Sequence, residues 1–234
     1  LKKAALPLFF FILNSFYSII IPIHNEENII PELLKHLKPF SLNGHEIIII
    51  DDGSQDNSKF ILNEYNFIKV ITLEKNLGKG KAIQKGLIEA TNSKIILFDG
   101  DMEIHPKEIN HLMILDNNKD LNCIFGNRFK KITPLKSKWD FGNYFFTYIF
   151  NFIHKSSIED SLCCAKAFFK NDVDPLKLKS TQFDIDIELA SILIKKNNDI
   201  ISIPIKYQRR TKKEGKKLSI YDGLSILKRI ITFI

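Results

Sequence analysis

The fold of this chain is decided by one stretch, Glu46-Ile47-Ile48-Ile49-Ile50-Asp51-Asp52-Gly53-Ser54. Side chains alternate between the two faces of a strand, so its consecutive isoleucines make both faces apolar. A strand that is apolar on both faces is typical of a parallel sheet that helices cover on both sides. The stretch therefore predicts a buried parallel strand that ends in a polar turn.

The segments on either side of this strand alternate in the same way. Short β-branched runs predict further strands, and apolar residues at helical spacing predict helices between them. Asn25 is expected to cap the first helix, and Pro106 to begin a later one. The expected strands cover 17–22, 69–73 and 94–98, and the expected helices cover about 25–37, 58–65, 79–90 and the residues after 106. This rhythm predicts an α/β fold with a mostly parallel central sheet flanked by helices.

The rhythm changes from Leu121 onward. The expected elements are a strand over 121–125, an aromatic-rich helix over 139–154, a strand over 162–169 at the edge of the sheet, an amphipathic helix over 184–195, a strand with Pro204 over 199–207 and an apolar stretch over 219–234. The sequence contains no internal repeat, low-complexity tract or linker. We therefore expect a single domain over 17–234.

An apolar leader over 1–16 precedes this domain. It starts with basic residues and continues with about ten apolar ones, as a signal peptide does. However, Pro7 interrupts the run, no A-x-A cleavage site follows, and a membrane-spanning helix needs about 20 residues. An irregular or interfacial leader, a remnant of a signal or anchor, and an artefact of the start site all stay open.

The composition is that of a globular protein, with 44% hydrophobic and 26% charged residues, which excludes wholesale disorder and a collagen-like fibre. Three cysteines without a CxxC pair exclude a zinc ribbon and favour a reducing compartment. The net charge is +7, and residues 206–217 alone carry seven Lys or Arg against Glu214. Such a local cluster indicates phosphate contacts or an anionic membrane surface, so we expect no nucleic-acid partner.

Polar turns follow the first four predicted strands. They cover 22–27, 51–56, 76–80 and 99–103. Ligands of open parallel sheets bind beyond the carboxyl ends of the strands, so these turns are expected to meet at one edge of the sheet.

Asp99-Gly100-Asp101 is the sharpest of these turns. Two carboxylates two residues apart can face one cation, and hard oxygen ligands suit Mg²⁺ or Mn²⁺. Glu103 is a candidate third ligand. In isolation the same residues fit an Asx turn without a metal.

The turn over 76–80 opens a helix, where glycines let the backbone approach a ligand and the helix N-terminus attracts anions. It lacks the spacing of a Walker A loop, and no G-x-G-x-x-G follows the first strand. Asp52 fits a bond to a nucleobase N–H or a cap of the following helix. Glu26 fits a pocket residue or a first-turn acid, and His24 taken alone favours a structural role.

The ordered combination resembles the family 2 glycosyltransferases of the GT-A fold. The motifs are Ile20-Ile21-Pro22-Ile23-His24-Asn25-Glu26-Glu27, Asp51-Asp52-Gly53-Ser54-Gln55-Asp56, Asn76-Leu77-Gly78-Lys79-Gly80 and Asp99-Gly100-Asp101. Within the family, the chain is most similar to the polyprenol-phosphate (dolichol-phosphate) mannosyl- and glucosyltransferase group. The resemblance covers about residues 17–225.

The resemblance implies roles for particular residues. The nucleoside pocket would be lined by Pro22, His24 in place of the family's usual Tyr, Glu26 and Asp52, with Lys79 near the nucleotide. The diphosphate and its metal would meet Asp99, Gly100 and Asp101, with Glu103 where the group often has Gln. Phosphate contacts would come from Arg128 in Gly126-Asn127-Arg128, and from Arg210 and Lys216 in a segment like Y-x-x-R…E-G-K-K.

One segment departs from the group's pattern. Asp160-Ser161-Leu162-Cys163-Cys164-Ala165-Lys166 stands where the group has a form like D-T-Q-C-G-F-K. Leu162, Cys164 and Ala165 therefore replace Gln, Gly and Phe. This region shapes the sugar and acceptor site, so the donor sugar stays open.

The resemblance implies a metal-dependent, inverting transfer of a hexose from a UDP- or GDP-sugar, with Mg²⁺ or Mn²⁺ as cofactor. The expected acceptor is a polyprenyl phosphate or another lipid-linked molecule at the cytoplasmic face of a membrane. The expected catalytic residues are Asp101, Asp160 as the first candidate base and Asp186 as the second.

Three alternatives stay open. A glycan hydroxyl could be the acceptor, or the chain could bind nucleotide-sugars without turnover. The aromatic stretch over 139–153 and the C-terminal stretch over 219–234 fit either core helices or helices lying on a membrane. A sugar-1-phosphate nucleotidyltransferase needs a Gly-rich, Arg-containing loop after its first strand, which 22–27 does not provide.

Overall fold

The computed structural model describes residues 16–129, 138–196, 200–210 and 220–232. A seven-stranded sheet runs through the molecule in the order β3-β2-β1-β4-β6-β5-β7. The strands are β1 (Tyr17–Ile23), β2 (Glu46–Asp51), β3 (Lys69–Thr72), β4 (Lys94–Leu97), β5 (Cys123–Asn127), β6 (Lys166–Phe169) and β7 (Ile201–Pro204). The first four strands are parallel to one another, as predicted.

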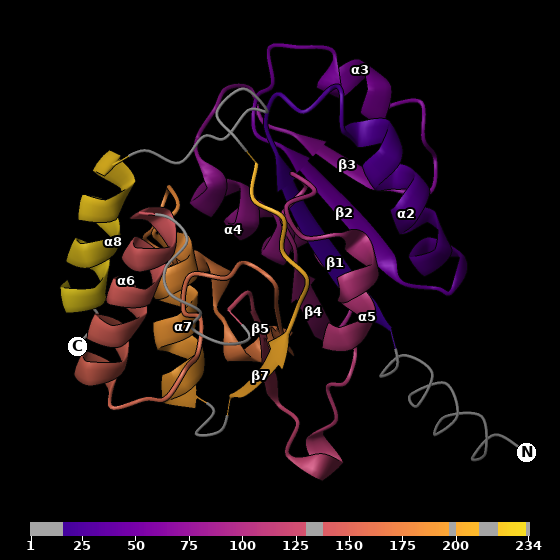
Figure 1. Cartoon of the computed structure of the whole chain (residues 1–234). Coiled ribbons are helices and arrows are strands. Elements are labelled where there is room, and N and C mark those ends of the chain that lie inside the picture. Colours follow the sequence, from indigo (N-terminus) through magenta and orange to yellow (C-terminus); the bar gives the residue numbers. More distant parts are fainter. Residues whose placement is uncertain (1–15, 130–137, 197–199, 211–219, 233–234) are drawn as a thin grey trace, which may run out of the picture.

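Helices cover both faces of this sheet (Figure 1). The longer ones are α2 (Ile30–Leu42), α4 (Lys79–Glu89), α6 (Lys138–His154), α7 (Ile185–Lys196) and α8 (Ile220–Thr232), and the short ones are α3 (Ser58–Leu62) and α5 (Ile109–Leu112). Single 3₁₀ turns cover Pro106–Glu108, Asn117–Lys119, Lys170–Asp172 and Pro175–Lys177.

The strand β2, which the sequence predicts most clearly, lies between two hydrophobic cores. Ile47 and Ile49 face the core that α2 and α5 close, and Ile48 and Ile50 face the core that α4 and α7 close. All of these isoleucines are at most 2% exposed. The strand is therefore apolar on both faces because helices cover both faces, as the sequence predicts.

The strand predicted over 162–169 is shorter and is not at the edge of the sheet. β6 lies between β4 and β5 and runs antiparallel to both. Its residues Lys166, Ala167 and Phe168 are fully buried, as a central strand requires. The edge position belongs to β7, whose last residue is Pro204, and a proline without an N–H is tolerated there.

Two predicted helix starts differ in the structure. Asn25 does not cap α2, whose N-cap is Ile29 without a side-chain bond. Asn25 has a φ of 50° and its side chain accepts the N–H of Gln55, so it joins two turns instead. Pro106 begins a 3₁₀ turn that leads into α5, and the side chain of His105 caps that turn.

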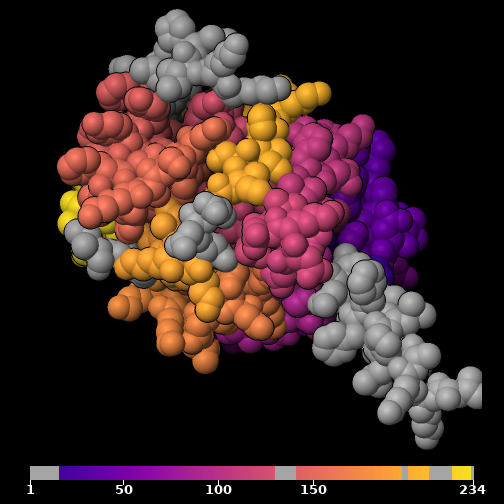
Figure 2. Space-filling view, turned by 90° about the horizontal axis from the view of Figure 1, so that it is seen from below, coloured from indigo at the N-terminus to yellow at the C-terminus, as the bar shows by residue number. Residues whose placement is uncertain are grey.

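The two halves of the chain occupy opposite sides of the molecule. In Figures 1 and 2 the N-terminal part, in indigo, and the region around α6, in salmon, lie at opposite ends. Among the described helices, none combines the length and the apolar character that crossing a membrane requires. The predicted leader over 1–16 falls, except for Phe16, outside the described residues.

Candidate active site

A pocket of about 370 Å³ opens at the carboxyl ends of β1, β2 and β4. From β1 the chain continues to β2 and β3 on one side of β1, and then crosses to β4 on its other side. The point where the strand order reverses in this way is the switch point, where open α/β sheets bind ligands. The volume suits a small-molecule ligand. The predicted site residues that line it are Pro22, His24, Glu26, Asp52, Lys79, Asp99, Gly100, Asp101, Glu103, Arg128, Asp186 and Arg210.

Two of the predicted residues are not among those that line the pocket. Asp160 lies behind Arg128 with a fully buried side chain. Lys216 lies outside the described residues, as does most of the basic cluster over 206–217. Only residues 206–210 of that cluster can be placed.

Asp52 holds the turn that opens α4. Its two carboxylate oxygens accept the backbone N–H groups of Leu77 at 2.8 Å and Gly78 at 2.9 Å. Burial raises the pKa of Asp52, and these two N–H groups offset part of the effect. Asp52 does not cap the following helix α3, whose N-cap is Asn57 without a side-chain bond; the side chain of Asp56, one residue earlier, accepts the N–H of Ser58 at 3.0 Å.

Gly78 must be glycine at this turn. Its φ is 92°, a region that other residues rarely adopt, and a Cβ atom there would overlap the backbone oxygen of Thr181. The next glycine, Gly80, donates its N–H to the same oxygen at 2.9 Å. The loop around Thr181 therefore packs directly against the turn that lines the pocket.

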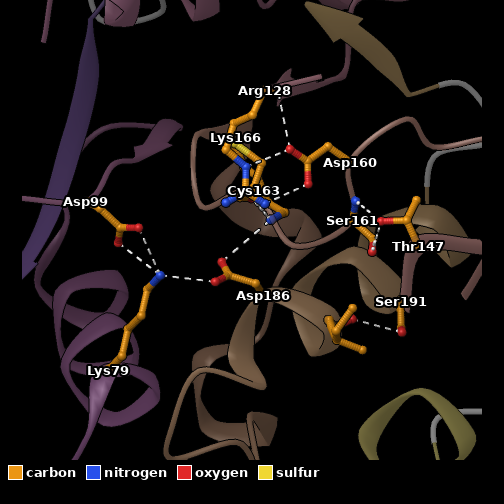
Figure 3. Close-up of polar contacts among 11 residues, drawn as sticks. Lys79, Asp99, Arg128, Thr147, Asp160, Ser161, Cys163, Lys166, Asp186 and Ser191 are labelled. Carbon is orange, nitrogen blue, oxygen red and sulfur yellow. Dashed lines mark hydrogen bonds and ion pairs between the residues drawn. The ribbon is translucent and has the colours of Figure 1, made fainter. Parts of the chain in front are cut away.

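Lys79 joins two carboxylates across the pocket. Its Nζ is 2.9 Å from Oδ1 of Asp99 and 3.0 Å from Oδ2 of Asp186 (Figure 3). Burial acts to lower the pKa of Lys79, but the two carboxylates outweigh it and raise that pKa well above its usual value. Burial acts to raise the pKa of Asp99, and Lys79 reverses this, so that the pKa is lowered.

The pKa of Asp101 is shifted in the opposite direction, upward. Burial and the neighbouring carboxylates of Asp99 and Glu103 raise its pKa to about 7. Negative charge is therefore concentrated on this side of the pocket, and a bound cation would relieve it. Asp99 and Asp101 are hard oxygen donors of the kind that Mg²⁺ and Mn²⁺ use together with substrate phosphates, so the donor set fits such an ion.

Glu103 has another use in this structure. Its two oxygens accept the hydroxyl of Tyr207 and the backbone N–H of Arg210, both at 2.8 Å. No three acidic, histidine or cysteine side chains of the described residues converge as a ready-made metal site. The predicted third ligand therefore secures the segment over 207–210.

That segment brings Arg210 to the wall of the pocket beside Glu26. Nη1 of Arg210 is 3.1 Å from both carboxylate oxygens of Glu26 and 3.2 Å from the backbone oxygen of Asp101. Glu26 is buried. The pair places one guanidinium close to the predicted metal ligands.

Arg128 and Asp160 form a two-point ion pair. Nε of Arg128 is 2.7 Å from Oδ2 of Asp160, and Nη2 is 2.8 Å from Oδ1. Burial acts to lower the pKa of Arg128, and Asp160 reverses this and raises it. The structure thus makes Asp160 the partner that orients Arg128, behind the residues that line the pocket.

Lys166 is a buried cation whose position the sequence analysis missed. Its Nζ lies 3.6 Å from Oδ1 of Asp186 and also donates to the backbone oxygen of Cys163 (Figure 3). Asp186 therefore faces two lysines. The sequence shows Lys166 inside a motif, but only the pairing of β6 with β4 brings it under the pocket.

The second half of the pocket comes from residues that sequence patterns did not single out as site residues. They are Asn143, Gln182, Phe183, Arg209 and Ile226, from α6, the loop before α7, the segment after β7 and α8. Leu162, Asn76 and Tyr207 belong to motifs that the sequence analysis quotes and also line the pocket.

Known proteins resemble this chain in sequence and in fold. Residues 18–174 match the family model described as Glycosyl transferase family 2. The chain belongs to this family. The predicted family and the predicted GT-A fold are both confirmed.

Relatives of this family 2 member include two sugar transferases. An undecaprenyl-phosphate 4-deoxy-4-formamido-L-arabinose transferase of Proteus mirabilis is 36% identical over 41% of this chain, which is 32% of its own length. A dolichyl-phosphate beta-glucosyltransferase of Dictyostelium discoideum is 26% identical over 90% of this chain and 71% of its own length. The chain thus matches about a third of the first relative's length.

The fold is also that of a solved enzyme. Glucosyl-3-phosphoglycerate synthase of Mycobacterium tuberculosis, in complex with Mn²⁺, UDP-glucose and phosphoglyceric acid, superposes with a TM-score of 0.72. The two chains are 14% identical, and the match covers 94% of this chain and 79% of the other. At this identity the likeness concerns the fold.

Proposed function

We propose that this chain transfers a hexose, with inversion, from a nucleoside-diphosphate sugar to a polyprenyl phosphate or another lipid-linked acceptor. The observation that carries the proposal is the pocket at the switch point of the sheet. It combines the carboxylates of Asp99 and Asp101 with the cations of Lys79, Arg128 and Arg210. Carboxylates for a metal beside cations for phosphate are the groups that a diphosphate leaving group needs.

The nucleoside end of the donor fits the side of the pocket formed by β1 and β2. Pro22, His24, Glu26 and Asp52 line that side, and the turn held by Asp52 presents the N-terminus of α4 to an anion. Mn²⁺ and UDP-glucose in the Mycobacterium enzyme of the same fold support a nucleotide-sugar and a divalent metal here. UDP and GDP both remain candidates for the donor nucleotide.

In this proposal the residues of the pocket act mainly by binding the metal ion and by neutralising the negative charge of the diphosphate. Asp99 and Asp101 would hold Mg²⁺ or Mn²⁺, which supplies Lewis-acid neutralisation of the leaving diphosphate. Arg128, fixed by Asp160, and Arg210, fixed by Glu26, add positive charge where negative charge develops. Lys216 would extend this set.

The surroundings of the candidate bases favour a phosphate acceptor. Both oxygens of Asp160 accept from Arg128, and Asp186 faces Lys79 and Lys166. A hydroxyl acceptor needs a base that takes its proton, whereas a phosphate is already ionised. This geometry supports a lipid phosphate over a glycan hydroxyl.

One face of α6 fits a lipid surface. Its exposed aromatic residues recur at helical spacing and form the aromatic stripe Phe141, Tyr144, Phe145, Tyr148 and Phe152. Asn143 of α6 and Ile226 of α8 line the pocket, so both helices reach the acceptor side. We therefore propose that this face lies on the cytoplasmic face of a membrane, where an interfacial helix would bring the pocket to its acceptor.

A donor panel tests the reaction. The chain is incubated with UDP- and GDP-hexoses and Mn²⁺ or Mg²⁺, and hydrolysis and transfer to polyprenyl phosphate are measured. We expect transfer from one donor. In Asp101→Asn we expect the transfer rate to fall at least about 100-fold, which is the size of effect seen when one charge-stabilising group is removed. Binding without turnover would indicate a nucleotide-sugar-binding protein, and transfer to a glycan hydroxyl alone would indicate the other acceptor class.

Adsorption to liposomes tests the membrane surface separately. Anionic vesicles at low salt should bind the chain, and the double variant Tyr148→Ser with Phe152→Ser should bind clearly less. Phe60→Ser is the matched control, because Phe60 is an exposed aromatic residue on the distant helix α3. Equal binding of all three proteins would argue against the aromatic stripe.

A further inference from the structure

Lys79 donates hydrogen bonds to two carboxylates and contacts both oxygens of one of them. Its Nζ lies 2.9 Å from Oδ1 and 3.2 Å from Oδ2 of Asp99, and 3.0 Å from Oδ2 of Asp186. The contacts to Oδ2 of Asp99 and to Oδ2 of Asp186 are hydrogen bonds, and the contact to Oδ1 of Asp99 is an ion-pair contact. The side chain is 11% exposed and its Nζ also lies 5.7 Å from the centre of the Phe183 ring. Both oxygens of Asp99 thus lie within 3.2 Å of Nζ, so a cation that binds Asp99 must compete with Lys79.

The carboxylates of Asp99 and Asp186 differ in the ion pairs that remain to them if Lys79 moves away. Asp186 keeps Lys166, whose fully buried Nζ lies 3.6 Å from its Oδ1. Asp99 forms an ion pair with Lys79 alone among the described residues. Figure 3 shows Lys79 between Asp99 and Asp186, with Lys166 on the other side of Asp186. Lys79 can thus leave Asp99 and stay with Asp186.

Leaving Asp99 without a replacement is unfavourable. Asp99 lines the pocket together with Asp101 and Glu103, so carboxylates are crowded on this side of the pocket. The side chain of Asp99 is 31% exposed, and Cys164 and Arg128 also favour its charged form, so the loss of Lys79 removes part of its compensation and is unfavourable. A divalent cation that binds Asp99 must first displace Lys79, and the displaced ammonium then needs new acceptors.

A nucleoside diphosphate supplies those acceptors. Because its phosphate oxygens would lie against the same side of the pocket, the ammonium of Lys79 can turn to them when the cation takes its place on Asp99. Resting on the function proposed above, we propose that Lys79 couples the two ligands: it holds Asp99 in the ligand-free enzyme, opposes binding of the cation alone, and makes cation and nucleotide bind cooperatively. Coupling of this kind is reciprocal and typically changes affinity about 5–150-fold.

The test measures Mn²⁺ binding rather than turnover. The free-ion signal in electron paramagnetic resonance gives the Kd for Mn²⁺ in the wild type and in Lys79→Met, each alone and with uridine or guanosine diphosphate. In the wild type we expect the nucleotide to tighten Mn²⁺ binding. In Lys79→Met we expect Mn²⁺ alone to bind several-fold more tightly, and the tightening by nucleotide to fall at least about fivefold.

Two further variants make the result specific. Lys81→Met removes the same charge from the same helix at a residue that does not line the pocket, and should behave as the wild type. Lys79→Gln keeps hydrogen-bonding capacity without the charge and serves if Lys79→Met does not fold. The proposal is wrong if Lys79→Met and Lys79→Gln bind Mn²⁺ alone no more tightly than the wild type does. If no nucleoside diphosphate binds the wild type, the proposed function fails instead, and the nucleotide-free measurement still decides about Lys79.

Discussion

Arg229 of α8 donates from Nε to Oδ2 of Asp184, at 2.9 Å, and so joins the C-terminal helix to the start of α7. The same carboxylate oxygen accepts the hydroxyl of Ser180 at 2.9 Å. Residues 180–183 form the loop that packs against Gly78 and Gly80 and lines the pocket. The position of α8 is thus connected to a wall of the pocket through one carboxylate.

Breaking this pair should loosen both the fold and the pocket. Arg229→Met should lower the free energy of unfolding by about 1–3 kcal/mol, less than the 3–5 kcal/mol of a fully buried pair, because Arg229 is 18% exposed. The donor KM should rise more than kcat falls, since the loop lines the binding site. Urea unfolding and steady-state kinetics measure the two effects.

Lys228→Met on the exposed side of α8 is the control for that variant. A double-mutant cycle with Asp184→Asn isolates the pair from other contacts of Arg229. An unchanged KM in both single variants would separate the ion pair from the pocket and leave it a purely structural contact.

Gly78→Ala should damage the turn that opens α4. Its φ of 92° and the overlap of a Cβ atom with the backbone of Thr181 force the turn or the loop to shift, and strain of this kind amounts to about 1–3 kcal/mol. We expect lower stability and weaker nucleotide binding, measured by thermal unfolding and by titration calorimetry.

Gly142→Ala is the matched control for Gly78→Ala. Gly142 lies within α6, where a Cβ atom would meet nothing within 4 Å. Alanine in a helix is favoured over glycine by about 0.5–1 kcal/mol. This variant should be as stable as the wild type or more so, and equal losses in both variants would contradict the argument from Thr181.

Asp160→Asn distinguishes a base from a residue that orients Arg128. The variant leaves the guanidinium of Arg128 without its buried counter-charge, so stability should fall by as much as about 3–5 kcal/mol. If Asp160 acts only through Arg128, the donor KM rises and the pH profile of kcat keeps its shape. Loss of the acidic limb of that profile, with KM unchanged, would instead identify Asp160 as the base, because a base must be deprotonated to act.

His45 makes the N-terminal strand sensitive to acid. Its Nδ1 accepts the backbone N–H of Tyr17 at 3.2 Å, which requires the ring to be neutral. Burial lowers the pKa of His45 below its usual value of 6.5. A lowered pKa means that the unfolded chain binds the proton more readily, so this group's contribution to stability is lost as the pH falls below about 6.5.

The free energy of unfolding, measured by urea titration between pH 8 and pH 5, should therefore fall more in the wild type than in His45→Gln. His111→Gln is the control, because His111 is a largely exposed histidine paired with Glu108. Parallel pH dependence in the wild type and His45→Gln would show that His45 does not set it.

The strands and helices around the carboxyl ends of β1, β2 and β4 could be predicted from local patterns. The isoleucines over 47–50 and the polar turns after each strand report burial and chain reversal within a few residues. The parallel order of the first four strands then follows from short right-handed connections. For this reason Asp52, Lys79, Asp99 and Asp101 were predicted to share one pocket, and they do.

Other features depend on residues that are far apart in the sequence. Asn25 has the chemistry of a helix cap, but Gln55 from the next turn competes successfully for its side chain. Glu103 has the chemistry of a metal ligand, but Tyr207 and Arg210 bind it. A local pattern states what a side chain can do, and distant partners decide which of these bonds forms.

By itself, the sequence determined the α/β rhythm, the family and the residue types that meet at the edge of the sheet, because periodicity and turn chemistry act over a few residues. Only the tertiary structure decided that β6 lies inside the sheet, that Lys166 stands behind Asp186 and that Asp160 serves Arg128. The physical reason is that a buried charge takes whichever counter-charge the fold brings within about 4 Å, and that distance is set by strand order and packing rather than by neighbours in the chain.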